Sequence, residues 1–266
     1  MSRKHKETVR KQFTKTADAF AKFAVRDTPE VLAEKVEFAK PQPHELVLDV
    51  ACGPGAYILA IAPRVSFAFG IDLTPEMLRQ AHEFQTEKQI AHAAFACADA
   101  EHIPFPDASF DLVSCQLAFH HVTKAEPVLE EMMRATKPQG RLLIIDPLAP
   151  ESDSKFELFN QIERLRDPSH TFSLRLTTLL SMFEEHGLEV LRQSVRRRQR
   201  SFNQWMRRAG LEPGQKRYME TRERMEESMP GDKAGFSARV EGDDIQIIHN
   251  EGMFLLRGGR TVGGMW

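Results

Sequence analysis

Residues 47–55 read VLDVACGPG, and this stretch decides how the rest of the chain is interpreted. Its apolar start, residues 47–50, predicts a buried strand. The strand stops at the glycines and proline of residues 53–55, and residues 56–62, AYILAIA, follow as a helix. Glycines in such a turn let the backbone approach a ligand closely, and the first helical turn offers free N–H groups to negative charge. We therefore expect a cofactor at this turn.

The overall composition excludes several classes of protein. The chain has 266 residues, enough for one sizeable core with elaborations, and its net charge of -2 gives no bias toward nucleic acid or membranes. No stretch approaches the ~18 apolar residues of a membrane span, and the N-terminus lacks the apolar segment of a signal peptide. We therefore expect a cytoplasmic protein. Its three cysteines form no CxxC pair, so we expect no metal site.

Strand and helix patterns alternate after the first turn. A helix begins at Pro75 behind Thr74 as N-cap, and Thr123 with Glu126 predicts a capping box for another helix. The alternation predicts a parallel sheet covered by helices on both faces, with ligands outside the carboxyl ends of the strands. The further strands of this pattern are expected over residues 66–72, 93–99, 110–116 and 141–146.

The two ends of the chain are mainly helical by pattern. Before the first strand, residues 4–40 predict two helices, with Phe13 and Phe20 on an apolar stripe that suits packing better than contact with a ligand. After the fifth strand we expect a helical insertion over 153–166 and a helix ended by Gly187. The remaining segments are a polar strand over 188–200, charged helices within 201–232, and two short strands within 244–257.

Three acidic residues lie at or near the ends of successive strands: Asp49, Asp72 and Asp99. Such ends lie side by side in a parallel sheet, so the three carboxylates line one crevice. A carboxylate after the second strand can accept hydrogen bonds from both hydroxyls of a ribose. Asp99 can accept from an exocyclic amine such as that of adenine, and Leu73 and Met77 supply apolar surface for a ring.

Several stretches of the chain match a known series of motifs: DVACGPG (49–55), GIDLTPEML (70–78), ADAE (98–101) with Pro104-Phe105, and FDLV (110–113). They resemble the successive motifs of class I S-adenosylmethionine-dependent methyltransferases. Within that superfamily the chain is most similar to the branch that contains the ubiquinone/menaquinone biosynthesis C-methyltransferases. Residues 166–170, RDPSH, and the helix over 174–187 also resemble this branch.

The resemblance implies a Rossmann-like, doubly wound, mostly parallel seven-stranded sheet with S-adenosyl-L-methionine as cofactor and S-adenosyl-L-homocysteine as product. It implies an N-terminal helical lid over residues 1–40, a cofactor-binding core over 41–150, and completion of the core with helical elaborations around the acceptor over 151–266. Ala51 departs from the superfamily glycine, as it often does in this branch. Phe20 replaces a tyrosine that relatives often carry in the lid.

The same resemblance assigns roles to individual residues. Asp49 and the turn with Ala51, Gly53 and Gly55 meet the methionine moiety. Asp72 holds the ribose beside Leu73 and Met77, and Asp99 with Ala100 meets the adenine. Gln116 lies beside the amino group of the cofactor or the transferred methyl, and Phe13 and Phe20 belong to the lid over the substrate.

Methyl transfer requires an aligned nucleophile, a dry site and a base where the acceptor carries a proton. The candidate bases are His120, His121 and His170, because imidazole titrates near neutrality. The alternative at each position is a histidine at a helix start or on the surface that takes no part in the reaction. The acceptor is expected to be a small organic molecule, methylated at carbon or oxygen.

Other functions remain open from the sequence. A nicotinamide-dependent oxidoreductase would need G-x-G-x-x-G, and the third glycine is absent after Gly55. An RNA-binding or RNA-modifying protein would use the basic residues 196–200, but acids follow and no aromatic residues are interleaved, so nucleic acid is disfavoured. A pseudoenzyme with an intact cofactor site is not excluded, and the sequence leaves open whether the chain forms a homodimer.

Overall fold

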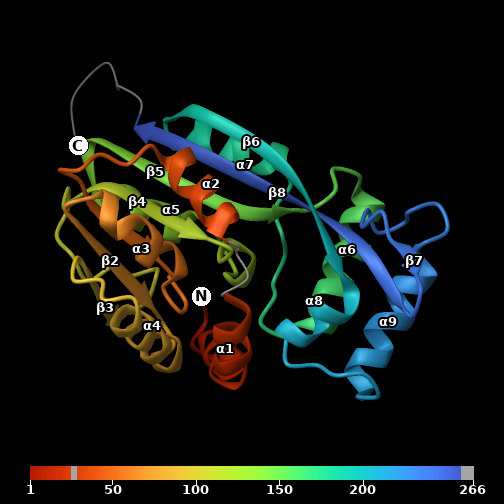
Figure 1. Cartoon of the computed structure of the whole chain (residues 1–266). Helices are drawn as coiled ribbons and strands as arrows, with labels where there is room; N and C mark the ends of the chain where they lie inside the picture. The colour runs from red at the N-terminus through yellow and green to blue at the C-terminus, as the bar shows by residue number, and fades with distance from the viewer. Residues whose placement is uncertain (25–28, 259–266) are drawn as a thin grey trace.

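The computed structural model describes residues 1–24 and 29–258, and of residues 19–24 it describes the backbone alone. In this part of the chain one sheet has the strand order β3-β2-β1-β4-β5-β8-β6, with β7 paired to β8 (Figure 1). Strands β1 to β5 are parallel, and β8 is antiparallel to β5 and β6. Their bounds are β1 Leu46–Val50, β2 Phe67–Asp72, β3 Ala93–Cys97, β4 Phe110–Gln116, β5 Thr136–Leu148, β6 Leu188–Ser201, β7 Arg239–Glu241 and β8 Asp244–Gly258. The predicted α/β architecture is confirmed.

Two details of the predicted sheet are wrong. The sheet has eight strands rather than seven, because the short β7 pairs with the first residues of β8. The two short strands expected within residues 244–257 are one continuous strand, β8. Gly252 lies inside this strand, where a side chain would press against the Phe254 ring at 2.6 Å. The glycine there serves close packing and does not make a turn.

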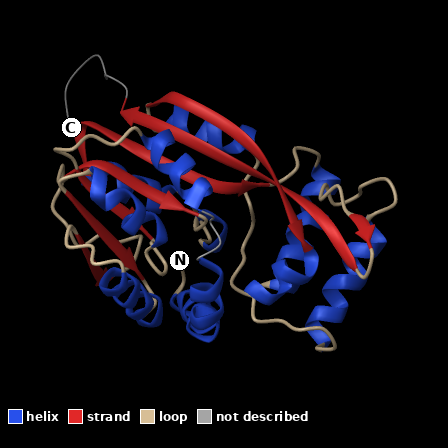
Figure 2. Ribbon diagram, viewed as in Figure 1, coloured by secondary structure: helices blue, strands red, loops and turns tan. Residues whose placement is uncertain are grey.

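Helices cover both faces of the sheet, as Figure 2 shows. Side chains alternate along each strand, so Leu112 packs into the core under α2, α3 and α4, while Val113 packs into the core under α5 and α7. Thr74 and Pro75 begin α4 as predicted. The capping box at Thr123 is wrong, because Ala125 is the N-cap of α5. The helices are α2 Pro29–Ala39, α3 Ala56–Ile61, α4 Pro75–Glu87, α5 Glu126–Ala135 and α7 Leu176–Glu185, with short 3-10 turns at η1 Ala62–Arg64 and η2 Phe119–His121.

A second lobe forms where β6 and β8 run beyond the main sheet (Figure 1). It contains α6 (Asp153–Arg166), α8 (Phe202–Arg208) and α9 (Lys216–Ser228). The lobe has its own apolar core, in which the rings of Phe159 and Phe236 stack with centroids 4.5 Å apart. Burial of such rings is the main stabilising contribution to a small lobe of this kind.

Helix α1 (Arg3–Ala24) lies between the main sheet and the second lobe (Figure 1). The Gln12 amide donates to the carbonyl of Ala209 at 3.2 Å, and the Thr14 hydroxyl donates to Glu76 on α4 at 2.8 Å. These bonds fasten α1 to both bodies across the carboxyl ends of the strands. Over the described residues, the helices are too short or too polar to cross a membrane.

The turn between β1 and α3 depends on Gly55. Its φ of +77° is strained for other residues, and a β-carbon there would meet the Phe95 ring at 2.9 Å. We expect Gly55→Ala to lower the free energy of unfolding by about 2–4 kcal/mol, measured by urea denaturation. Gly214→Ala is the matched control, since φ is +88° and the space is open. It should cost about 1 kcal/mol, and equal losses in the two variants would contradict the role of Phe95.

Candidate active site

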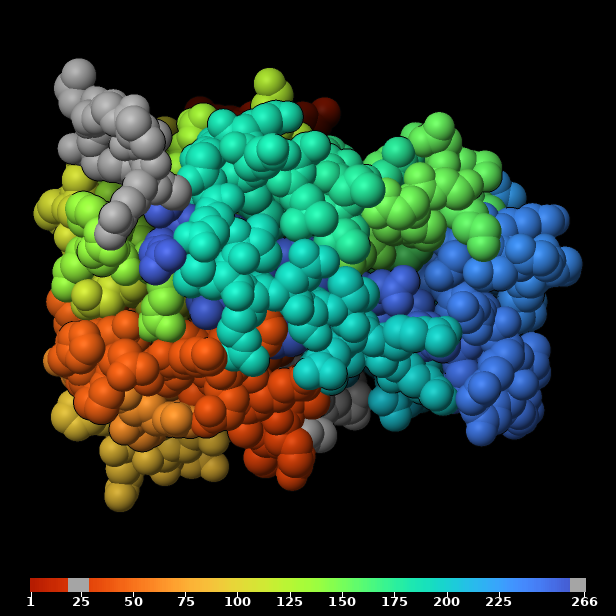
Figure 3. Space-filling view, turned by 90° about the horizontal axis from the view of Figure 1, so that it is seen from above, coloured from red at the N-terminus to blue at the C-terminus, as the bar shows by residue number. Residues whose placement is uncertain are grey.

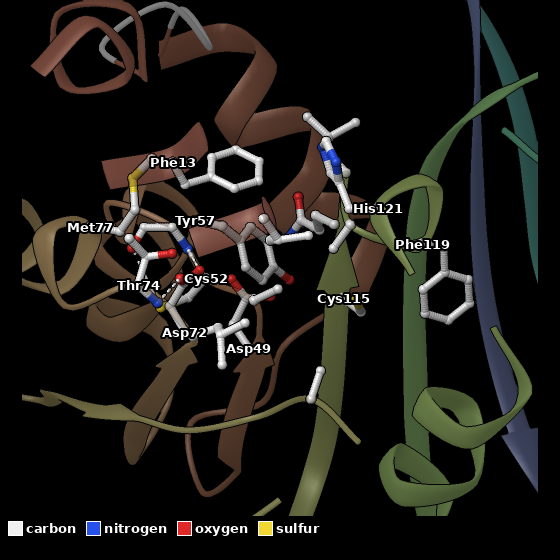
Figure 4. A pocket seen from close by; sticks show the side chains of 18 of the residues that line it. Phe13, Asp49, Cys52, Tyr57, Asp72, Thr74, Met77, Cys115, Phe119 and His121 are labelled. Atoms are coloured by element: carbon white, nitrogen blue, oxygen red, sulfur yellow. Dashed lines mark hydrogen bonds between the residues drawn. The ribbon is translucent and has the colours of Figure 1, made fainter. Parts of the chain in front are cut away.

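One cavity lies at the carboxyl ends of β1, β2 and β4, under α1. In Figure 4, Phe13 lies between Met77 and His121, with Tyr57 beneath it and two aspartates on the floor of the cavity. The site predicted from the sequence is therefore largely assembled in three dimensions. The predicted cofactor or lid residues on the wall are Phe13, Asp49, Ala51, Gly53, Asp72, Leu73, Met77, Asp99, Ala100 and Gln116.

One predicted cofactor residue, Gly55, is not part of this wall. Gly55 is the N-cap of α3 and packs against Phe95, so it shapes the turn from behind. The side chain of Phe20 lies outside the described residues.

Asp72 ties the glycine turn to the start of α4. One carboxylate oxygen accepts from the Gly53 N–H at 2.9 Å, and the other accepts from the Thr74 N–H at 2.8 Å. Burial raises the pKa of Asp72 above its ordinary value, while these two N–H groups oppose the rise. The Thr74 hydroxyl and the Leu73 N–H also oppose the rise, so a diol would share the carboxylate oxygens with these donors.

Asp49 is buried beneath the cavity, with 3% of its surface exposed. The Ser114 hydroxyl donates to it at 2.5 Å, yet burial raises the pKa of Asp49 to about 7. The Lys35 ammonium opposes this rise. An anion that is costly to bury favours a ligand that brings positive charge close to it.

Asp99 already has a partner from α1. The Lys6 ammonium binds Asp99 and also Glu101, the latter at 2.7 Å. Although burial opposes it, Lys6 holds the pKa of Asp99 below its ordinary value. The predicted adenine acceptor is therefore ionised and linked to α1.

Among the wall residues that the sequence did not assign to the site are four with polar or charged side chains: Lys35 from α2, Tyr57 from α3, Thr74 at the start of α4 and Arg208 from α8. Tyr57 belongs to the helix after the glycine turn, which was a usable signal. Thr74 lies between the predicted residues Leu73 and Met77, so it had a local signal as well. Helices α2 and α8 reach the cavity through long-range packing that no local pattern records. The Tyr57 hydroxyl and the Gln116 amide nitrogen are buried without a hydrogen-bond partner among the described residues. Two such groups on one wall suit a polar ligand.

The three candidate histidines come together, but only one of them lines the cavity. The His121 ring is on the wall, and the Phe13 ring meets it edge-on at 4.9 Å. The ring centroids of His120 and His170 lie 4.2 and 6.4 Å from that of His121. His120 and His170 are not among the residues on the wall and pack behind it.

The surroundings raise the pKa of one of the three rings and lower the pKa of the other two. Burial favours neutral His120, but the Asp146 carboxylate at 2.9 Å raises its pKa above the ordinary value. Burial lowers the pKa of His121, and His120 lowers it further. Burial also holds the pKa of His170 well below its usual range. His121 is thus a neutral imidazole on the cavity wall, with a basicity below that of an ordinary histidine.

Comparison with known proteins decides the family. Residues 48–144 match the methyltransferase domain family. The protein named uncharacterized methyltransferase YcgJ, of Bacillus subtilis, is 33% identical over 198 residues, which cover 74% of this chain and 78% of YcgJ. The chain belongs to the S-adenosylmethionine-dependent methyltransferases. The crystal structure of YcgJ matches this methyltransferase with a TM-score of 0.78 and 27% identity, over 86% of this chain and 98% of YcgJ.

Other relatives match only part of the methyltransferase. The demethylmenaquinone methyltransferase of Deinococcus radiodurans is 37% identical over 45% of this chain and 48% of its own length. The ubiquinone/menaquinone biosynthesis C-methyltransferase UbiE of Methylococcus capsulatus is 36% identical over 42% and 46%. The predicted family, cofactor and enzymatic class are confirmed, and the oxidoreductase alternative is not supported.

The basic residues 196–200 of the methyltransferase are part of β6, which is open at the surface in Figure 3. Arg196 and Arg198 bind Glu34 of α2 at 2.5 and 3.2 Å, and Arg198 also binds Glu251 of β8 at 3.0 Å. These guanidinium groups join structural elements to one another. The RNA alternative receives no support from them.

Asp49 should make the stability of the unliganded methyltransferase depend on pH. Its pKa is about 7 in the folded chain, against an ordinary value of 3.8 that we take for the unfolded chain. Between these two pH values the folded chain therefore binds more protons than the unfolded chain. The free energy of unfolding contributed by this group therefore falls as pH rises through that window. Asp49→Asn should stabilise the protein by on the order of 2–4 kcal/mol at pH 8 and by much less at pH 4.

Thermal and urea unfolding at the two pH values measure this effect. Asp153→Asn, at an exposed carboxylate, is the control and should change stability by less than about 0.5 kcal/mol. A gain for Asp49→Asn that is equal at pH 4 and pH 8 would show that the buried charge is not its source.

Proposed function

We propose that this methyltransferase methylates a small organic acceptor, at carbon or oxygen, inside the cavity under α1. The observation that carries the proposal is the combination, on one wall, of the predicted cofactor residues and a neutral imidazole, His121, beside the Phe13 ring. The names of the relatives that act on demethylmenaquinone and ubiquinone precursors support an aromatic acceptor. The methyltransferase fold alone would not select one.

The residues present fit S-adenosylmethionine. Asp72 would hold the ribose, Asp99 with Ala100 the adenine, and the turn at Gly53 the methionine moiety. The unpartnered Tyr57 hydroxyl and Gln116 amide offer further polar contacts. When bound, the cofactor supplies a methyl group on a positively charged sulfur, and the buried Asp49 carboxylate favours such charge nearby.

His121 would act as the general base when the acceptor carries a proton. A ring nitrogen of His121 would take the proton of the acceptor, while the bound cofactor would supply the methyl group that replaces it. Proton removal of this kind contributes about 100-fold to 10,000-fold to a rate. His120 and His170 would support the His121 ring from behind.

We also propose that residues 1–40 form a lid. Lys6 binds Asp99 and Glu101, and the Phe13 ring covers the cavity, so α1 closes the site by polar and apolar contacts. A closed lid excludes water from the reacting groups. In this proposal residues 41–150 bind the cofactor and residues 151–266 complete the acceptor side through α8.

The cofactor site is tested by calorimetric titration with S-adenosylmethionine, S-adenosylhomocysteine and NAD. We expect micromolar binding of the two adenosyl ligands and none of NAD. Asp72→Ala should weaken binding of S-adenosylhomocysteine by about 1.5–3 kcal/mol, because hydrogen bonds to a charged group are lost. Asp153→Ala is the control, because Asp153 is the exposed first residue of α6 and does not line the cavity. Its affinity for S-adenosylhomocysteine should stay at the wild-type value. Unchanged affinity in Asp72→Ala would refute the ribose assignment.

The acceptor class is tested with 1,4-naphthohydroquinone as the probe. The purified enzyme with S-adenosylmethionine should form S-adenosylhomocysteine and a methylated product, detected by mass spectrometry. His121→Gln should reduce kcat at least about 100-fold while leaving S-adenosylhomocysteine affinity within about twofold. Full activity in that variant would remove His121 from the reaction.

A further inference from the structure

The RDPSH motif, residues 166–170, was singled out by sequence and has no part in the proposed cofactor site. It follows α6 and begins a loop, residues 167–173, that packs against η2. Thr171 donates from its backbone N–H and its hydroxyl to the carbonyl of His120, at 2.8 and 2.9 Å. The loop therefore holds the backbone of the η2 histidines.

The loop is itself fixed to α6 by one buried amide. The Asn160 carbonyl oxygen accepts from the His170 Nε2–H at 3.0 Å and from the Ser173 N–H at 2.7 Å. Both contacts are buried, so the loop has little freedom relative to α6. It can serve as a rigid support for a neighbouring side chain.

Ser169 connects this loop to the ring of His121. The Ser169 hydroxyl donates its single hydrogen to the Asp167 carboxylate at 2.5 Å, and Asp167 also accepts the Ser169 N–H at 2.9 Å. The same hydroxyl oxygen lies 3.1 Å from His121 Nδ1. Because its hydrogen is already committed to Asp167, the hydroxyl can only accept from Nδ1–H.

This arrangement selects one tautomer of His121. With the proton on Nδ1, the basic lone pair is on Nε2 of a ring that lines the cavity. We propose that Asp167 and Ser169 are positioning residues that hold His121 as the Nδ1–H tautomer, so that Nε2 accepts the proton of the acceptor. This inference rests on the proposed function of His121 and extends it to two residues away from the cavity wall.

The charges around His121 agree with this assignment. His120, His170, Arg166 and Asp167 face or surround the ring from η2, α6 and the loop, and the His5 ring on α1 bonds the His121 carbonyl at 2.8 Å. Of these groups only Asp167 brings a negative charge toward the ring through Ser169. When His121 takes up a proton, the Asp167 carboxylate offsets the new positive charge.

The tautomer can be measured directly, without knowledge of the natural acceptor. Imidazole proton–nitrogen correlation NMR on the full chain, with and without S-adenosylhomocysteine, should show His121 protonated on Nδ1 and bare on Nε2. His121→Gln assigns the signal by its loss. Ser169→Ala should convert the signal to a tautomer mixture or to the Nε2–H form, and Asp167→Asn should do the same.

Ser173→Ala is the matched control. Ser173 is a buried serine of the same loop, and its hydroxyl has no hydrogen-bond partner within the described chain. The variant should keep the wild-type His121 signal. With 1,4-naphthohydroquinone, Ser169→Ala should lower kcat about 10-fold or more, with the KM for S-adenosylmethionine within about twofold, while Ser173→Ala keeps both values.

The outcomes separate this inference from the proposed function. Retention of the Nδ1–H tautomer in Ser169→Ala, or an Nε2–H tautomer in the wild type, would overturn the positioning role. The tautomer decides this even where Asp167→Asn fails to fold. Failure of the proposed function would appear elsewhere: the wild type would not bind S-adenosylhomocysteine, or His121→Gln would keep full activity with the hydroquinone.

Discussion

The Asp72 carboxylate accepts from the N–H of Gly53 and the N–H of Thr74, and so joins the end of β2 to two separate turns. The first turn follows β1 and the second begins α4. The N-cap residues of α3 and α4 make no side-chain capping hydrogen bond. The Asp72 carboxylate therefore fixes the distance between the two turns. The cavity exists because these two turns stand apart at a set distance, and the neighbouring parallel strands place Asp49 on its floor.

The acidic floor is unfavourable for the unliganded protein. Burial raises the pKa of both Asp49 and Asp72, which means that each charge costs folding free energy until something positive approaches. Stability and binding are in opposition at these two positions, as is common where a site is prepared for a ligand. Lys35 of α2 offsets part of this charge, which gives the second helix an electrostatic role besides packing.

Much of this site was predictable from sequence because its residues follow strand ends, and strand ends converge in a parallel sheet. Asp49, Asp72 and Asp99 were placed by that rule, whereas Gln116 at the end of β4 was placed by the family resemblance. Lys6 and Arg208 could not be placed, because they come from helices whose packing against the sheet has no local signal. The contact of Ser169 with His121 joins segments 48 residues apart and is equally invisible to periodicity. Strand β8 was predicted as two strands because the sequence Asn250-Glu251-Gly252 resembles a turn. In the structure these residues remain in the strand, and Arg198 of β6 forms an ion pair with Glu251.

Strands β6 and β8 pair without interruption of the ladder from the Leu188 end to Ser201, apart from one irregularity near Val190. The same two strands belong to the main sheet and to the second lobe, so the two bodies are joined by rows of hydrogen bonds and not by a linker. Bending this connection would break many backbone hydrogen bonds at once. Helix α8 therefore cannot move away from the cavity as a separately linked domain would. Under the lid proposal, molecules would pass in and out by movement of α1, because side-chain contacts, not strand pairing, hold this helix in place.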